Sequence, residues 1–439
     1  MLNKDGRKRI FYWVDYLRRS PFVRNVSIVM SGTAVSQVIS FALTPIISRL
    51  FSPADFGVLG SFSSVLGVVV AGVTLQYSQA IMLPKEDRDA ANVFAVSLLS
   101  VALITCLSIA AAVLFSDRLL SLLNATQAGW LLWLLPLGIL VSGLNQTFQA
   151  WCVRKKAFKA TASSHVIRAG FAGALQIVAG FFKAGGAGLA AGAVAADGIA
   201  LLNLSSQVLG TDKKLIKGAL CRRSLVQKAI EYRDFPLYSA TQNIMSSLSM
   251  GLPVLLLAHF FGIAAAGSYA FGLKLLQVPM NFILTALRQV LFQKATETYN
   301  QNGDILLLFK KITVGLFFSA IIPAFLFFLF APALFVWCFG DNWFEAGIFV
   351  RWLIIWQVFQ FCNVPSVLYA RILRLQKKMF VYETLILFTR TACLIIGGIF
   401  FSINQTIGIF SVAGALLNIA MIFWIWKILN TKLQKGMLE

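Results

Sequence analysis

Charged residues are scarce in this chain of 439 residues. They make up 13% of it, whereas 58% of the residues are hydrophobic. A soluble domain of this length would need a larger polar shell around its core. The scarcity of charge therefore excludes a soluble globular protein. It favours a protein embedded in a membrane, where apolar side chains face lipid.

Acidic residues, histidine and cysteine are also few, with 17 Asp and Glu, two His and six Cys. The cysteines are scattered without CxxC or other paired spacing, so neither a disulfide framework nor a metal site is expected. The two histidines stand on different predicted helices, which makes a poor metal site. The chain also lacks the GxSxG, HExxH and Walker motifs. We therefore expect no enzyme activity and no bound cofactor.

Apolar runs of about 20 residues recur along the chain, and a helix of that length crosses the roughly 30 Å hydrocarbon core of a bilayer. We predict an all-α polytopic membrane protein with twelve transmembrane helices. The expected spans are 25–48, 57–80, 91–115, 129–150, 161–182, 187–209, 236–261, 267–292, 306–330, 346–369, 380–401 and 406–428.

The Lys and Arg residues are sorted by side when these spans are placed in a membrane. With the N-terminus in the cytoplasm, 30 of the 38 lie in the cytoplasmic arm, loops and tail, and 4 lie outside. Basic residues concentrate on the cytoplasmic side of membrane proteins. The asymmetry therefore predicts that both termini are cytoplasmic. It also accounts for the net charge of +21 without a nucleic-acid partner.

A basic cytoplasmic linker at 210–235 divides the spans into two groups of six. This predicts an N-terminal six-helix lobe at 1–209, which includes the basic arm, and a C-terminal six-helix lobe at 236–439. Because each lobe has an even number of spans, both lobes enter the membrane in the same direction. Two such lobes can be related by a pseudo-twofold axis along the membrane normal.

A weak internal repeat supports two related lobes. At an offset of 210 residues, Gly57 corresponds to Gly267, and each lies where the first two spans of its lobe are joined. Proline follows the same plan, with Pro45 in the first span and Pro253 in the seventh. Since proline removes a helical hydrogen bond, both spans are expected to bend there.

Four basic residues remain inside the expected spans, and they give the first indication of function: Arg168, Lys274, Arg288 and Arg390. In span eight, Lys274, Gln277 and Asn281 recur at steps of three and four, which places them on one helical face. A charge that faces lipid costs at least a few kcal/mol, so this face is expected to line a wet cavity. Arg288 lies near the cytoplasmic end and can snorkel to the interface.

A cavity with more bases than acids suits an anion such as a phosphate or diphosphate, which Arg and Lys bind well. Arg168 has an alternative role, because Asp197 lies in the neighbouring span and the two could form a structural ion pair. Arg390 is expected to be unpaired, since Glu383 is seven residues away on the same helix.

The segment between the first two spans reads Arg49-Leu50-Phe51-Ser52-Pro53-Ala54-Asp55-Phe56-Gly57. It resembles the corresponding segment of the bacterial O-antigen-type polysaccharide flippases, within the multidrug/oligosaccharidyl-lipid/polysaccharide exporter superfamily. The echo Ala266-Gly267-Ser268-Tyr269 in the second half is similar to theirs as well. The twelve spans, the cytoplasmic termini and the basic central loop extend the resemblance over essentially the whole chain.

The resemblance implies a transporter of the bacterial cytoplasmic (inner) membrane that works by alternating access. Its cargo would be O-antigen or capsule repeat units linked to undecaprenyl diphosphate, with membrane lipids around the prenyl tail. A polysaccharide polymerase and a chain-length regulator are implied partners. Lys274, Arg390 and Arg168 would bind the diphosphate head, and Asp197 would couple transport to H+ or Na+.

Arg49 and its repeat counterpart His259 would belong to an outer gate, although capping of the turn or anchoring at the interface explains them equally well. Two other functions compete with the leading one. A cation-coupled multidrug exporter of the same superfamily would favour acidic cavity residues, and a polysaccharide polymerase or glycosyltransferase would need an acid cluster or a large outer loop. The identity of the glycan, the coupling ion and the oligomeric state are not encoded in these patterns.

Overall fold

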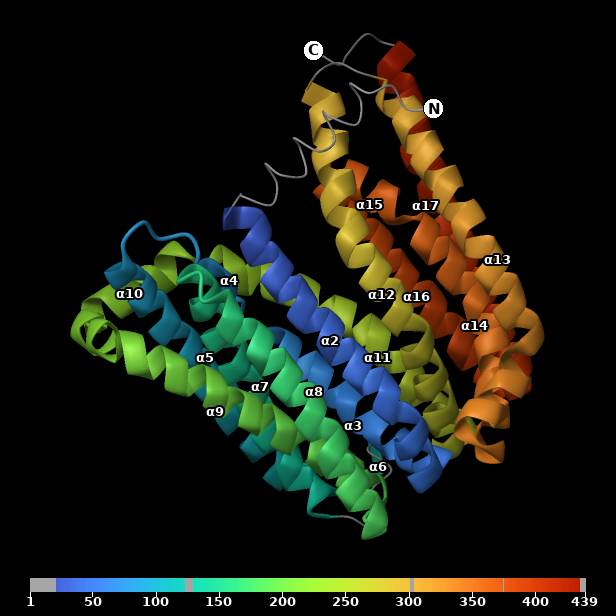
Figure 1. Ribbon diagram of the computed structural model, residues 1–439, viewed down its shortest axis with the longest axis horizontal. Coiled ribbons are helices and arrows are strands. Elements are labelled where there is room, and N and C mark those ends of the chain that lie inside the picture. The colour runs from blue at the N-terminus through green and yellow to red at the C-terminus, as the bar shows by residue number, and fades with distance from the viewer. Residues whose placement is uncertain (1–20, 123–128, 301–303, 374, 435–439) are drawn as a thin grey trace, which may run out of the picture.

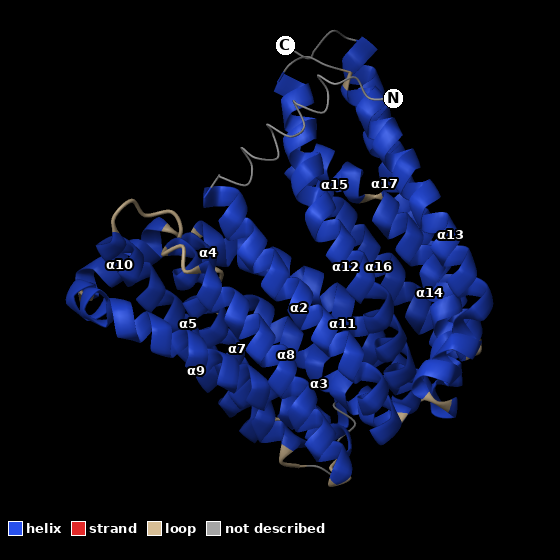
Figure 2. Ribbon diagram, viewed as in Figure 1, coloured by secondary structure: helices blue, strands red, loops and turns tan. Residues whose placement is uncertain are grey.

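The computed structural model describes residues 21–122, 129–300, 304–373 and 375–434. Throughout these ranges the chain is helical, with short connecting loops and no strand (Figure 2). The expectation of an all-α polytopic membrane protein is confirmed. The reason is physical: without water in the hydrocarbon region, a helix satisfies its backbone hydrogen bonds within the segment itself.

The N-terminal half contains eight helices before the central linker. They are α2 (Pro21–Leu50), α3 (Pro53–Gly72), α4 (Tyr77–Ala80), α5 (Asp87–Leu114), α6 (Ser116–Leu122), α7 (Leu131–Arg154), α8 (Phe158–Phe181) and α9 (Gly185–Ala219). The expected linker is itself largely helical, because α9 continues to Ala219 and α10 (Arg222–Glu231) follows at once.

The C-terminal half begins with a short π-helix, η1, that continues directly into α11. Its elements are η1 (Phe235–Ala240), α11 (Thr241–Phe261), α12 (Ile263–Asn300), α13 (Ile305–Phe339), η2 (Asp341–Trp343), α14 (Phe344–Cys362), α15 (Val364–Ile372), α16 (Gln376–Phe400) and α17 (Ile403–Gln434). Each of the twelve expected spans falls on a long helix or on two consecutive ones.

Ten helical segments of the described chain are long and apolar enough to cross a membrane. The helices α8 and α12 are not among those ten, so the count of twelve spans stays a prediction. The two halves form separate bundles that diverge toward the end where α2 begins and α17 ends (Figure 1). The helices α3, α11 and α12 pack together where the bundles meet.

The start of α3 is fixed by the residues of the motif between the first two spans. Ser52 is the N-cap of α3, and its backbone N–H donates to the Asp55 carboxylate at 2.9 Å while its hydroxyl accepts from the Asp55 backbone N–H. Pro53 at the first helical position needs no backbone donor. One turn into the helix, the Phe56 ring contacts Phe271 and Trp343 of the other half, with ring centroids 5.1 and 5.0 Å away.

The two glycines of the internal repeat lie at the closest approach of the halves. A Cβ atom at Gly57 would lie 2.0 Å from the Ile263 carbonyl oxygen, and a Cβ atom at Gly267 would lie 1.8 Å from the Pro53 carbonyl oxygen. Only glycine permits backbones to come this close. The contact is reciprocal, since the two pairs exchange under the offset of 210 residues, and such reciprocity is what a twofold relation produces.

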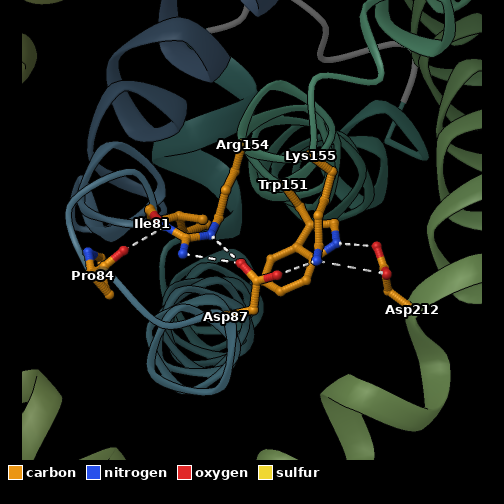
Figure 3. A network of polar contacts seen from close by, with 7 residues as sticks. All are labelled: Ile81, Pro84, Asp87, Trp151, Arg154, Lys155 and Asp212. Atoms are coloured by element: carbon orange, nitrogen blue, oxygen red, sulfur yellow. Dashed lines mark hydrogen bonds and ion pairs between the residues drawn. The ribbon is translucent and has the colours of Figure 1, made fainter.

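A polar network holds the N-terminal half together at the end away from the Gly57–Gly267 contact (Figure 3). Arg154 donates to the carbonyl oxygens of Ile81 and Pro84 at 2.8 and 2.9 Å, and it shares the Asp87 carboxylate with Lys155. Adjacent to this network, the Trp151 indole donates to Asp212 of α9 at 2.9 Å. The network joins α5, α7 and α9 with the loop that precedes α5.

Candidate functional site

The two halves line a wide, open cavity of about 760 Å³ on the side away from the Gly57–Gly267 contact. Its N-terminal wall is built by the end of α3, the α4 region and α7, and its other wall is the first half of α11. Most of its polar groups are amides and hydroxyls: Gln76, Ser78, Gln79, Gln146, Gln149, Asn243, Ser246 and Ser247. We call this cavity the cleft. It carries no acidic residue among its lining residues.

A second cavity of about 230 Å³ lies inside the N-terminal half and shares Gln146 and Gln149 with the cleft. It contains Arg168 of α8 and Asp197 of α9, whose side chains form a two-pronged ion pair. The Asp197 side chain is 15% exposed and that of Arg168 is 58% exposed. The alternative expectation of an Arg168–Asp197 ion pair is therefore correct.

Lys274 of α12, in the other half, lies near Arg168. Its side chain is exposed, and it is close enough to Arg168 for the two charges to repel each other. Since Asp197 neutralises much of the Arg168 charge, the net cation of this pair is Lys274. One turn further along α12, the half-buried Gln277 lies on the same helical face. Asn281 lies on α12 too, but its side chain is outside the described residues.

Arg390 does not join Lys274 and Arg168. It lines a third cavity, of about 300 Å³, inside the C-terminal half, and only 5% of it is exposed. Its Cζ atom lies 4.0 Å from the centre of the Trp356 ring and 4.5 Å from that of Phe410. This cavity shares Ser246 and Met250 of α11 with the cleft. The expected cationic residues therefore do not share one cavity. Arg168 lines the N-terminal cavity and Arg390 the C-terminal one, and Lys274 is not among the described lining residues of either or of the cleft.

The residues expected in a gate lie in two places. Arg49 and His259 are exposed at the ends of α2 and α11 on the side of the Gly57–Gly267 contact, and the His259 ring packs against Phe260. Pro45 lies inside α2 and the buried Pro253 inside α11. Their roles in gating stay predictions.

Sequence reasoning missed the polar face of α7. Gln146 and Gln149 line both the N-terminal cavity and the cleft, and the Asn145 amide donates to the Asp197 carbonyl oxygen at 2.8 Å. The signal was present, because Ser142, Asn145, Gln146 and Gln149 recur at steps of three or four in the fourth expected span.

Known proteins share the sequence pattern and the fold of this chain. A family model described as "Polysaccharide biosynthesis protein" matches residues 46–348. No curated protein matches the chain in sequence. The match and the fold together confirm the resemblance expected from the sequence.

Multidrug transporters are among the solved structures to which this fold is similar. The chain is similar to the inward-facing conformation of a multidrug resistance MATE family transporter of the MOP superfamily, with 14% identity, 93% of this chain and 98% of that chain covered, and a TM-score of 0.72. An outward-facing conformation of such a transporter gives 15% identity, coverage of 94% and 97%, and a TM-score of 0.56. A Vibrio cholerae MATE transporter mutant gives 15% identity, the same coverage and 0.55. These likenesses show the fold.

Proposed function

Since the chain belongs to the family of polysaccharide biosynthesis proteins, we propose that it is a flippase for lipid-linked oligosaccharides. It moves O-antigen or capsule repeat units, carried on undecaprenyl diphosphate, from the inner to the outer leaflet of the bacterial cytoplasmic membrane. The observation that carries the proposal is the pair of cationic side chains, Lys274 and Arg168, which come from different halves and lie near enough for their charges to repel each other.

The electrostatics of the cleft fit an anionic head group. Lys274 offers a mobile point charge, and the exposed guanidinium of Arg168 offers forked donors to phosphate oxygens. A diphosphate placed between them would relieve their mutual repulsion. The amides and hydroxyls of the cleft then suit the hydroxyl groups of a glycan, while the prenyl tail stays in lipid.

The shape of the protein fits alternating access. The cleft is lined by the end of α3 and the first half of α11, on the side that the charge asymmetry assigns to the cytoplasm. At the other end the halves touch through the backbones at Gly57 and Gly267. Rocking of the two halves would break this contact and open the cleft outward. Asp197, which already pairs with Arg168, is the carboxylate that would exchange H+ or Na+ in coupling.

A polysaccharide polymerase and a chain-length regulator would act on the product at the outer leaflet. The second candidate function is a cation-coupled multidrug exporter, which is favoured by the solved structures that share the fold. Cationic drugs would need acidic residues in the cleft. The described lining of the cleft contains none, and the cavity that shares Gln146 and Gln149 with it carries Arg168.

The test is deletion of the gene followed by complementation with variants. We expect the deletion to trap lipid-linked oligosaccharide at the inner leaflet and to remove surface polysaccharide. Lys274→Ala should fail to restore export, Lys274→Arg should restore part of it, and Lys311→Ala, which removes an exposed lysine of α13, should restore all of it. Membrane levels of each variant are measured by immunoblot.

Two results would overturn the proposal. Surface polysaccharide that is unchanged by the deletion, together with new sensitivity to cationic dyes, would establish the drug exporter instead. Full export by Lys274→Ala would remove the cationic cleft as the binding site.

A further inference from the structure

The cavity in the C-terminal half is a polar chamber with its own charge. It has a volume of about 300 Å³, within the range of small-ligand sites, and lies among α11, α14, α15, α16 and α17. Its walls carry amides and hydroxyls in addition to charged groups: Gln242, Ser246, Ser249, Gln360, Asn363 and Asn418. Such a wall can bind a polar ligand but does not by itself select a charge.

Arg390 supplies that selection. Within the described residues it takes part in none of the ion pairs, and its Nε atom is buried without a hydrogen-bond partner. The Tyr269 hydroxyl lies beside the guanidinium, but as a neutral group it does not balance the charge. The acid on the same helix, Glu383, is about 10 Å away along the axis. Its carboxylate pairs instead with Gln242 and faces Arg371.

The buried charge of Arg390 lacks an anion among the described residues to balance it. A guanidinium stays charged in proteins, and burying a charge without a partner is unfavourable. The Trp356 and Phe410 rings offset part of that cost through cation–π contacts. The rings offer no strong acceptor to the N–H donors of Arg390, so its buried Nε donor stays without a hydrogen bond.

In the N-terminal half, the charge of the corresponding arginine is balanced by a carboxylate of the protein itself. Arg168 and Arg390 stand on the fifth and eleventh expected spans, which hold equivalent places in the two lobes. Arg168 receives the Asp197 carboxylate from the following helix, α9. The helix that follows Arg390 is α17, which contains no Asp or Glu. It contributes Asn418 to the cavity, and that side chain accepts a hydrogen bond from Asn363 at 2.9 Å.

We propose that the C-terminal cavity is a binding site for one external anionic group, held by Arg390 in the place where the other half has Asp197. The cavity adjoins the cleft, because Ser246 and Met250 of α11 line both spaces. The anionic group can come from two sources. One is the carboxylate of an acidic sugar in the cargo, which rests on the proposed function, and the other is a free inorganic anion such as chloride or phosphate.

The test is anion binding by the purified full-length protein in detergent. The thermal unfolding midpoint is measured against sodium glucuronate, glucose, chloride and phosphate at constant ionic strength, and the concentration dependence gives an apparent Kd. Arg390→Met removes the charge but keeps a long side chain, and Arg390→Lys keeps the charge. Arg118→Met, at an exposed arginine outside all three cavities, is the matched control.

We expect Arg390→Met to weaken anion binding about tenfold or more, as the loss of a charge-assisted hydrogen bond does. Arg390→Lys and Arg118→Met should retain binding. Stabilisation by glucuronate but not by glucose, chloride or phosphate identifies the acidic sugar, and stabilisation by chloride or phosphate identifies a free anion. The proposal is overturned if no anion stabilises the wild-type protein, or if Arg390→Met binds as tightly. Because no transport is measured, failure of the flippase proposal would leave this result standing.

Discussion

Substitution of Gly267 by alanine tests whether the glycine contact closes the outer end of the protein. The new Cβ atom would lie 1.8 Å from the Pro53 carbonyl oxygen and 2.6 Å from the Gly57 nitrogen. Both neighbours are backbone atoms, so no side chain can rotate away. To reach an ordinary separation of about 3.5 Å, α3 and α12 must move apart by roughly 1.5 Å.

The energy of this overlap decides the outcome. Overpacking in a well-packed interface costs about 1–3 kcal/mol, and a rigid backbone neighbour places Gly267→Ala at the upper end. This cost applies only to the form in which the two helices touch. A difference of about 3 kcal/mol shifts the equilibrium toward the outward-open form on the order of a hundredfold.

Double electron–electron resonance measures this shift directly. Spin labels at Arg118→Cys and Asn342→Cys, both exposed near the outer ends of the two halves, report the distance across them in a background without the native cysteines. We expect Gly267→Ala to lengthen the distance distribution. Gly315→Ala on α13, where an added Cβ meets nothing within 4 Å, should leave it unchanged. An unchanged distribution in a folded Gly267→Ala variant would refute the reasoning.

Two further predictions concern charges. Arg168→Met should lower the melting temperature of the purified protein more than Asp197→Asn does. The first variant leaves a largely buried carboxylate unpaired, and the second leaves an exposed guanidinium. We expect the free energy of unfolding to fall by about 2–4 kcal/mol in the first and by about 1 kcal/mol in the second. Equal effects would show that burial does not decide the cost. The backbone N–H groups of Ser224 and Arg223 lower the pKa of the exposed Cys221 thiol at the start of α10, so more thiolate is present at neutral pH. Its alkylation by iodoacetamide at pH 7 should therefore be faster than that of N-acetylcysteine, and a slower reaction would contradict the expected shift.

Most of the membrane fold could be predicted because few physical quantities determine it. The length of each apolar run gives a span, and the basic residues give its orientation. The repeat of Gly57 at Gly267 was visible as well, since close backbone contact tolerates no other residue. The α10 helix was not expected from the sequence. Its Lys228 contacts Asp89 of α5 at 2.8 Å. That contact joins residues far apart in the chain, so local sequence patterns do not reveal it.

The candidate site was predicted less completely. Helical periodicity places Lys274 and Arg390 on faces of their helices, but it does not say which neighbouring helix each face meets. Arg168 and Asp197 could be paired in advance because consecutive spans pack side by side. The Trp356 and Phe410 rings that contact Arg390 come from two other helices, α14 and α17, and only the packed structure brings them together.

Lys274 and Arg390 would recognise different groups of the cargo. Lys274, near Arg168, would meet the diphosphate that every cargo carries, so its loss should impair all cargoes alike. Arg390 would meet a group that only some glycans carry. If its anion comes from the cargo, Arg390→Met should reduce export of a repeat unit with an acidic sugar and spare a neutral one of similar size, measured as surface polysaccharide in paired strains. Equal loss with both repeat units would instead assign Arg390 to a step common to all cargoes.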